Sequence, residues 1–215
     1  MPSLTGSFVA YLGDQLDLTP EQREIARFGL QTLLYPIVNF LLICLAGWLL
    51  GCLWAMVTAA LATIVLRAFS HGAHSRTPLT CILIGLVAFS IFGKTAALLA
   101  PSLSPGELLL IILAGFIPSL IAVWRLAPAD SPAKPITSPR DRQKLRLYSL
   151  ITACCILVMQ IILLVSGKVS VIVLATGLGF WWQAFSLTGA GHRLATLLDN
   201  TLAGKEGAPH ETLLQ

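Results

Sequence analysis

The sequence predicts an all-α, polytopic membrane protein with about six transmembrane helices. Only 11% of its 215 residues are charged, against roughly 25% in a typical soluble domain. Hydrophobic residues make up 56% of the chain and the mean hydropathy is +0.82. Several apolar runs are long enough to cross about 30 Å of hydrocarbon. We therefore expect one membrane domain, residues 1–215.

The N-terminal segment, residues 1–27, is mixed in composition and predicts an interfacial helix. Within it, Thr19-Pro20-Glu21-Gln22 is typical of a helix start. Thr19 suits the N-cap, Pro20 suits the first helical position, and Gln22 can reach back from the third. This helix either lies on the membrane or leads into the first span.

Six apolar runs follow and predict the membrane spans. Only the tight turn at Gly51 separates the first two runs, so they should form a helical hairpin. The predicted spans are residues 28–49, 52–69, 79–99, 106–126, 147–166 and 169–187. Between the fourth and fifth spans, residues 127–146 combine four prolines with basic residues and predict an extended linker. Residues 188–215 form a short polar tail.

The basic residues give the orientation, because Lys and Arg accumulate in cytoplasmic loops. With the N-terminus inside and six crossings, all of the 14 Lys and Arg residues except Lys94 and Lys168 fall on the cytoplasmic side. The linker, the tail and the polar segment 70–81 fall there too. A site formed by the linker and this segment would therefore be cytoplasmic.

One segment, residues 67–81 with the sequence RAFSHGAHSRTPLTC, concentrates reactive side chains. It holds two of the four histidines, two arginines and, at Cys81, the only one of the five cysteines in a polar neighbourhood. Ionisable residues at a membrane are costly to insert, which makes them functional candidates. A cysteine nucleophile needs a base within hydrogen-bond reach, and either His71 or His74 could serve.

The spacing requires a bend between histidine and cysteine. In one continuous helix His74 and Cys81 would be about 10 Å apart along the axis, too far for proton transfer. Pro78 supplies the bend, since it disfavours a helical Thr77 and suits the first position of a new helix. Cys81 then lies in the first turn, where the helix dipole stabilises a thiolate. The segment thus predicts a re-entrant or interfacial catalytic element.

The spacing alone leaves two alternatives open for this segment. The charged residues could simply mark a cytoplasmic loop, with Cys81 acting as a small hydrophobic residue. A metal site built from His71, His74 and Cys81 is disfavoured, because no carboxylate lies nearby. We expect no metal and no other cofactor.

The string RAFSHGAHSRTPLTC resembles the signature of the accessory gene regulator B (AgrB) family: a basic residue, a His-Gly-Ala-His run, and a cysteine seven positions after the last histidine. A second stretch, LAPAD at 126–130 followed by KPI at 134–136, resembles that family's linker. The order and spacing match over residues 20–195. The resemblance implies a cysteine endopeptidase of the bacterial cytoplasmic membrane that cuts a small precursor peptide of a quorum-sensing signal.

The resemblance also implies roles for single residues. His74 matches the catalytic histidine and Cys81 the nucleophile, which would form a thioester acyl-enzyme. In thiolactone-forming members an internal substrate cysteine then displaces the enzyme and closes a ring. Arg67 and Gly72 match signature positions. Arg67 would engage an acidic substrate tail and Gly72 would allow close backbone approach, although a snorkelling arginine and a helix-terminal glycine account for them equally well.

Other positions are less specific. His71 either orients His74 or lines the cleft, and we prefer the cleft. Lys134 matches a basic linker position, but this linker holds fewer lysines than the family's, which weakens the case for substrate docking there. No Asp or Glu lies near enough in sequence to be a third catalytic member. A polar group from another helix could serve: Gln31, Asn39 or Gln183.

The expected partners are the precursor peptide, the lipid bilayer and, by the resemblance, a second copy in a homodimer; no nucleic acid is expected. The rival hypothesis is a small peptide transporter or exporter, whose linker and histidines bind peptide without cleaving it. A transporter should show internal repeats or paired helix breaks, and none is evident. The precursor, its cleavage site and the cyclic or linear form of the product stay open.

Overall fold

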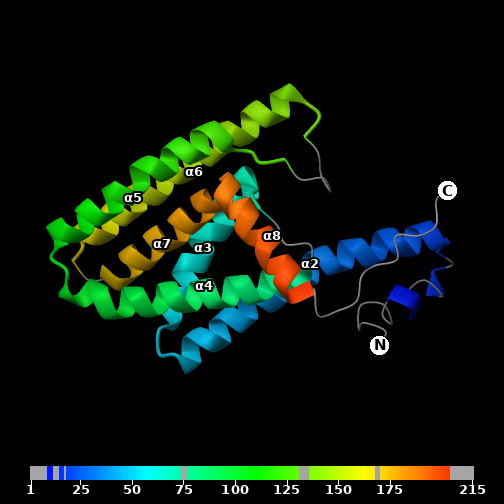
Figure 1. Cartoon of the computed structure of the whole chain (residues 1–215), viewed down its shortest axis with the longest axis horizontal. Coiled ribbons are helices and arrows are strands. Elements are labelled where there is room, and N and C mark those ends of the chain that lie inside the picture. The colour runs from blue at the N-terminus through cyan, green and yellow to red at the C-terminus, as the bar shows by residue number, and fades with distance from the viewer. Residues whose placement is uncertain are drawn as a thin grey trace. The chain divides into compact units, whose positions relative to one another are not determined.

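Helices make up nearly all of the structure, a computed structural model that describes residues 9–11, 15–16, 18–73, 77–130, 136–167 and 170–203. No strand occurs in these ranges, which confirms the predicted all-α class. The long helices (Figure 1) are α2 Pro20–Leu49, α3 Leu53–Ser70, α4 Pro78–Leu99, α5 Pro105–Leu126, α6 Pro139–Val165, α7 Ser170–Ser186 and α8 Gly189–Ala203.

The lengths and composition of these helices fit a multi-pass membrane protein. Among the described residues, five helices, α2 to α6, are long and apolar enough to cross a bilayer. Helices α7 and α8 together also pass this test, but they are bent by 85° at the short break between them. Counting that pair as one span gives six, so the prediction of about six spans is confirmed.

The first long helix, α2, starts where the sequence predicts. The Gln22 amide N–H donates to Thr19 Oγ1 at 3.3 Å, and the Thr19 N–H donates to Gln22 Oε1 at 2.9 Å. These two bonds form the predicted capping box. The helix then continues to Leu49 without a break. Of the two alternatives that the sequence left open, the helix therefore leads into the first apolar run. The boundary at residue 27, predicted between an interfacial helix and the first span, is not a helix end.

Two compact units make up the chain, Met1–Leu42 and Ile43–Gln215. Helix α2 begins in the first unit and ends in the second. Every contact described below lies within the second unit. That the whole chain forms one membrane domain stays a prediction.

Two predicted irregular segments are partly helical. The basic linker 127–146 is not extended throughout, because α6 starts at Pro139, where Ser138 Oγ accepts the Asp141 N–H at 3.5 Å. A Ser-Pro pair is a strong helix start, and hydropathy alone misses a polar first turn. The predicted tail contains α8, whose first turn is capped by Thr188 Oγ1 accepting the Gly191 N–H at 3.2 Å.

Helix α7 is the central helix of the second unit. It contacts α3, α4, α5, α6 and α8, and Figure 1 shows it between the α5–α6 pair and α4. Small residues bring it close to α3: a Cβ added at Gly179 would lie only 2.1 Å from the Ala59 carbonyl oxygen. Thr63 Oγ1 donates across the same contact to Gly179 O at 2.8 Å. Close backbone approach of this kind is how small residues join membrane helices.

The α3–α7 contact also sets the direction of the two helices. Thr63 is bonded to Gly179, and seven residues further along α3 Ser70 is bonded to Gln183. Helices α3 and α7 therefore run in the same direction, and their C-terminal ends meet at one end of the second unit. That end carries the candidate site.

Candidate functional site

Backbone hydrogen bonds gather three helix ends at this end of the second unit. Ala129 N–H, just beyond α5, donates to the carbonyl of Ser70, the last residue of α3, at 3.0 Å. Ala73 N–H donates to the carbonyl of Ser186, the last residue of α7, also at 3.0 Å. We call residues 67–73, 77–81, 127–130 and 183–186 the candidate site.

The start of α4 brings the cysteine into the candidate site. Thr77 is the N-cap, its hydroxyl accepts the Thr80 N–H at 3.3 Å, and Pro78 holds the first helical position, as predicted. A second contact of 2.7 Å joins the hydroxyls of Thr77 and Thr80. Cys81 follows in the first turn and is half-buried, and its N–H donates to Thr77 O at 3.3 Å. The positive end of the helix dipole therefore lies at this thiol.

The turn that leaves α3 has an unusual backbone. His71 has a φ of 56° and Gly72 a φ of 139°. A non-glycine residue with positive φ costs roughly 1–3 kcal/mol and persists only where its surroundings hold it. Such positions are concentrated at functional sites.

Gln183 holds this turn from α7. Its Nε2 donates to Ser70 Oγ at 3.0 Å and, by a shorter contact, to the His71 carbonyl. Gly72 packs directly on the same surface, since an added Cβ would lie 2.6 Å from Ser186 Oγ and 3.2 Å from Gln183 Nε2. Gly72 therefore meets two requirements at once, a positive φ and close approach of α7.

Arg67 closes the turn from the α3 side. Its Nη2 donates to the Ala73 carbonyl, so the guanidinium spans the residues between the helix and the end of the turn. The guanidinium also interacts electrostatically with Cys81. Arg67 thus links the last turn of α3 to Ala73, and its charge acts on the cysteine at the start of α4.

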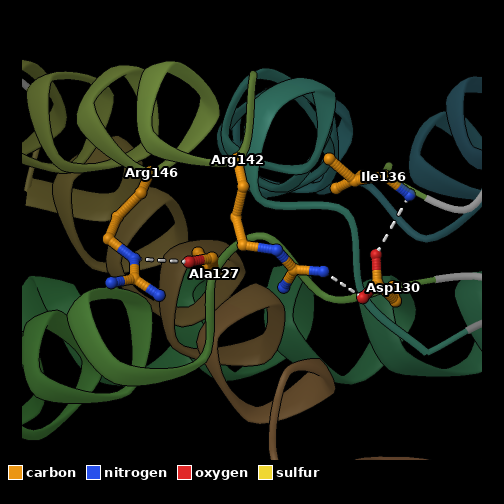
Figure 2. Close-up of polar contacts among 5 residues, drawn as sticks. All are labelled: Ala127, Asp130, Ile136, Arg142 and Arg146. Carbon is orange, nitrogen blue, oxygen red and sulfur yellow. Dashed lines mark hydrogen bonds and ion pairs between the residues drawn. The ribbon is translucent and has the colours of Figure 1, made fainter. Parts of the chain in front are cut away.

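The first part of the linker, Ala127–Asp130, is held by two arginines of α6 and by Ile136 (Figure 2). Arg146 Nε donates to Ala127 O at 3.0 Å, and Arg142 Nη2 pairs with Asp130 Oδ2. Ile136 N–H donates to Asp130 Oδ1 at 3.3 Å. The Arg142 guanidinium, the Ile136 N–H and, to a smaller extent, His71 lower the pKa of the Asp130 carboxyl below its ordinary value.

We expect the linker to detach from α6 at low pH. Folding lowers the pKa of Asp130, so the ion pair of its carboxylate with Arg142 stabilises the linker at pH values above 3.8, the ordinary pKa of this group. The ion pair is lost as the pH falls through the lowered pKa. Hydrogen exchange at the Ile136 amide, corrected for intrinsic rates, should then rise. The variant Asp130→Asn should show the faster exchange already at neutral pH, and an unchanged rate there would contradict this account.

The candidate site brings together four of the six residues named from the sequence. Arg67, His71, Gly72 and Cys81 lie in it, within the described residues. His74 and Lys134 lie outside the described residues. In the described part of the chain, which excludes His74, no three His, Cys, Asp or Glu side chains cluster as a metal ion would require.

The sequence did not single out several of the residues that build the site. Ser70 and Ser186 contribute contacts to the turn, and Asp130, Arg142 and Arg146 fix the linker. Gln183 was one of three candidate polar groups. Its signal is a lone amide in an otherwise apolar run, where a polar side chain is costly.

The fold and the candidate site define a class: a polytopic helical membrane protein with a cysteine in the first turn of a helix that interacts electrostatically with an arginine, where several helix ends meet. Comparison with known proteins makes the class specific. The sequence profile of Accessory gene regulator B matches residues 5–187. The chain belongs to the accessory gene regulator B family, which confirms the resemblance.

Individual relatives agree with the profile. AgrB-like proteins of Clostridium perfringens are 22% identical (strain SM101) and 24% identical (strain 13), each over 88% of this chain and 92% of the relative. An AgrB-like protein of Listeria monocytogenes serotype 4b is 27% identical over 58% of each chain. No solved structure matches the chain. Family membership supports a role in the accessory gene regulator quorum-sensing system and involvement in peptide processing.

Proposed function

We propose that this protein is a membrane cysteine endopeptidase that cleaves a small precursor peptide of a quorum-sensing signal. Cys81 is the nucleophile and His74 the base. The observation that supports this most strongly is the position of Cys81: a half-buried residue in the first turn of α4, a helix capped by Thr77, where it interacts electrostatically with the Arg67 guanidinium. Reactive cysteines in proteins typically occupy partly exposed positions with positive surroundings of this kind.

The reaction has two covalent steps. The Cys81 thiolate adds to the scissile carbonyl, the C–N bond breaks, and His74, which has taken the thiol proton, returns it to the leaving amine. The product is a thioester of the precursor's N-terminal part on Cys81. A thiol of the precursor, or water, then attacks this thioester and gives its proton to His74, and the bond between Cys81 Sγ and the acyl carbon breaks to restore the Cys81 thiolate. Attack by the precursor's own thiol yields a thiolactone.

The surrounding residues have supporting roles in this proposal. Arg67 carries five N–H donors, so it can hold Ala73 O and also receive an acidic substrate tail. Gly72 keeps the turn close to α7. We assign His71, whose charge acts on Asp130, to the surface that receives the peptide. Lys134, in the linker, contacts the peptide. None of these roles requires a cofactor.

The proposal includes a location and partners. The basic residues argue for the bacterial cytoplasmic membrane, with the candidate site on the cytoplasmic side. The structure agrees with the topology behind this argument, because the C-terminal ends of α3 and α7 meet at one end of the unit, as two outside-to-inside spans would. The precursor peptide is the substrate, and a homodimer is the proposed assembly.

The experiment that separates a peptidase from an exporter uses the purified protein in sealed vesicles with the fluorescently labelled cognate precursor outside. A peptidase should produce two fragments whose combined amount equals the precursor consumed. The variant Cys81→Ala should bind the precursor without producing fragments. Intact peptide accumulating inside the vesicles with no fragment formed would instead favour the exporter.

A further inference from the structure

Helix α6 carries an open apolar groove along one face. The groove has a volume of about 560 Å³ and extends from Leu150 to Leu163. Its lining includes Ile151, Cys155 and Val158, all of them exposed. At about 1.5 Å per residue the groove is about 20 Å long, somewhat more than half of the roughly 30 Å hydrocarbon core of a bilayer. Its length and its apolar lining therefore suit one acyl chain of a phospholipid.

The basic residues at the start of α6 divide between two faces of the helix. Arg142 and Arg146 are bonded to the first part of the linker and point toward it (Figure 2). Arg140 and Lys144 lie on the other side, because a step of two residues turns a helix by about 200°. Both are exposed, and neither side chain makes a hydrogen bond or ion pair within the described part of the chain. Two cations thus face away from the linker without a counter-charge.

These two outward cations share one stripe of α6 with the groove. Steps of three and four residues keep side chains on one face of a helix. Such steps connect Arg140, Lys144, Tyr148, Ile151, Cys155 and Val158, which we call the α6 stripe. Lys144 lies about 9 Å along the helix axis from the first residue of the groove. The α6 stripe therefore has a cationic end and an apolar end.

Tyr148 lies between the two ends of the α6 stripe. It is 47% exposed, and its ring packs edge-on against Phe69 with the ring centroids 5.7 Å apart. Phe69 is the next-to-last residue of α3, so Tyr148 lies at the end of the second unit that carries the candidate site. Exposed tyrosines of membrane proteins are enriched at the level of the lipid headgroups. The cationic end of the stripe is then at the headgroups and the groove is in the hydrocarbon.

We propose that the α6 stripe binds one anionic phospholipid: an acyl chain lies in the groove, and Arg140 and Lys144 hold the phosphate of the headgroup. Basic side chains beside a membrane attract anionic lipids. Long cationic side chains reach the headgroups while their apolar stems lie along the helix. A headgroup with a net negative charge, such as phosphatidylglycerol, is favoured over phosphatidylcholine, whose choline balances its phosphate.

A second copy of the chain is a poorer occupant of the α6 stripe. Two copies in one membrane share their orientation, so a two-fold axis along the membrane normal brings equal heights of α6 together. Arg140 and Lys144 would then face the same cations of the second copy, and like charges repel. An anionic headgroup instead supplies the opposite charge that these two cations lack within the described structure.

The lipid site is separate from the catalytic residues but shares a helix with the linker contacts. Arg142 and Arg146 hold the linker from the inner side of the same turns that carry Arg140 and Lys144 on the outer side. A phospholipid bound outside fixes these turns at the membrane surface. Lipid binding and linker position are therefore connected through the start of α6.

The test is native mass spectrometry of the delipidated full-length protein in detergent, titrated with phosphatidylglycerol or with phosphatidylcholine of the same acyl chains. The parent should bind its first phosphatidylglycerol about 25-fold more tightly, about fivefold for each cation. The double variant Arg140→Gln/Lys144→Gln should lose most of this preference. The matched control is Arg193→Gln, which removes an exposed cation of α8 outside the stripe and should keep the preference.

A phosphatidylglycerol with a photoreactive diazirine on its acyl chain locates the site in the same protein. After irradiation and digestion, the label should lie within residues 150–163. Ile151→Trp, a bulky change at an exposed position of the groove, should weaken the binding of both lipids and remove most of this label.

Four results would overturn the inference. They are equal affinities of the parent for the two lipids, a preference that survives the double variant, a label outside residues 150–163, and a delipidated dimer joined through α6 that excludes phospholipid from the groove. The last would assign the stripe to a second copy. Because lipid binding is read without turnover, these outcomes do not depend on the peptidase function proposed above.

Discussion

Replacing Cys81 by alanine is expected to reduce precursor cleavage by roughly a thousandfold or more, to the background of the assay, because no other group can form the acyl-enzyme. Cys81→Ser should be nearly as inactive, since a hydroxyl is a far weaker nucleophile than a thiolate at neutral pH. His74→Ala should lose about 10²- to 10⁴-fold, the usual contribution of a general acid–base group.

These losses are measured with purified protein in lipid, by the rate at which fragments of the precursor appear. Cys154→Ala is the matched control, because Cys154 is an exposed cysteine on α6. Its activity should equal that of the parent, and all variants should retain peptide binding. Cleavage at the parent rate by Cys81→Ala would remove the dyad from the account.

The largest effect on stability is expected at Gly179. A methyl group there would lie 2.1 Å from the Ala59 oxygen and 2.7 Å from its carbonyl carbon, both backbone atoms that cannot turn aside. Helices α3 and α7 would have to separate, and overpacking of this kind costs about 1–3 kcal/mol or more. Because the same contact brings Gln183 to Ser70, Gly179→Ala should also weaken peptide cleavage.

The measurement for Gly179→Ala is thermal unfolding in detergent, followed by loss of the monodisperse peak on size exclusion. Gly106→Ala is the control, because Gly106 lies in the first turn of α5 with no atom within 4 Å of an added Cβ. The Gly106→Ala variant should unfold at the same temperature as the parent or slightly above it, since alanine favours a helix. Equal melting of Gly179→Ala and the parent would contradict the close α3–α7 packing.

The helices of this protein were predictable because the bilayer sets the length of an apolar run. Helix starts at Thr19 and Thr77 were predictable for a local reason, since an N-cap and a following proline are neighbours in sequence. Hydropathy did not reveal the polar first turns of α6 or the whole of α8. Both lie outside apolar runs, where only caps such as Ser138 mark a helix.

The candidate site was predictable only where its residues are close in sequence. Arg67, Gly72 and Cys81 belong to one short motif, and its bend at Pro78 follows from local sterics. The contacts of Gln183 with Ser70 and of Asp130 with Arg142 depend on how helices pack and how the linker folds back. Sequence could only mark Gln183 as an amide in an apolar run, alongside Gln31 and Asn39.

The central claim is that Cys81 carries the acyl group, and intact mass spectrometry tests it most directly. The protein in lipid is mixed with a precursor whose own ring-closing residue is replaced by alanine, then quenched in acid. We predict an adduct with the mass of the precursor's N-terminal fragment, on Cys81 and released by hydroxylamine, in the parent but not in Cys81→Ala. Cleavage without any adduct, or an adduct that persists in Cys81→Ala, would contradict the account.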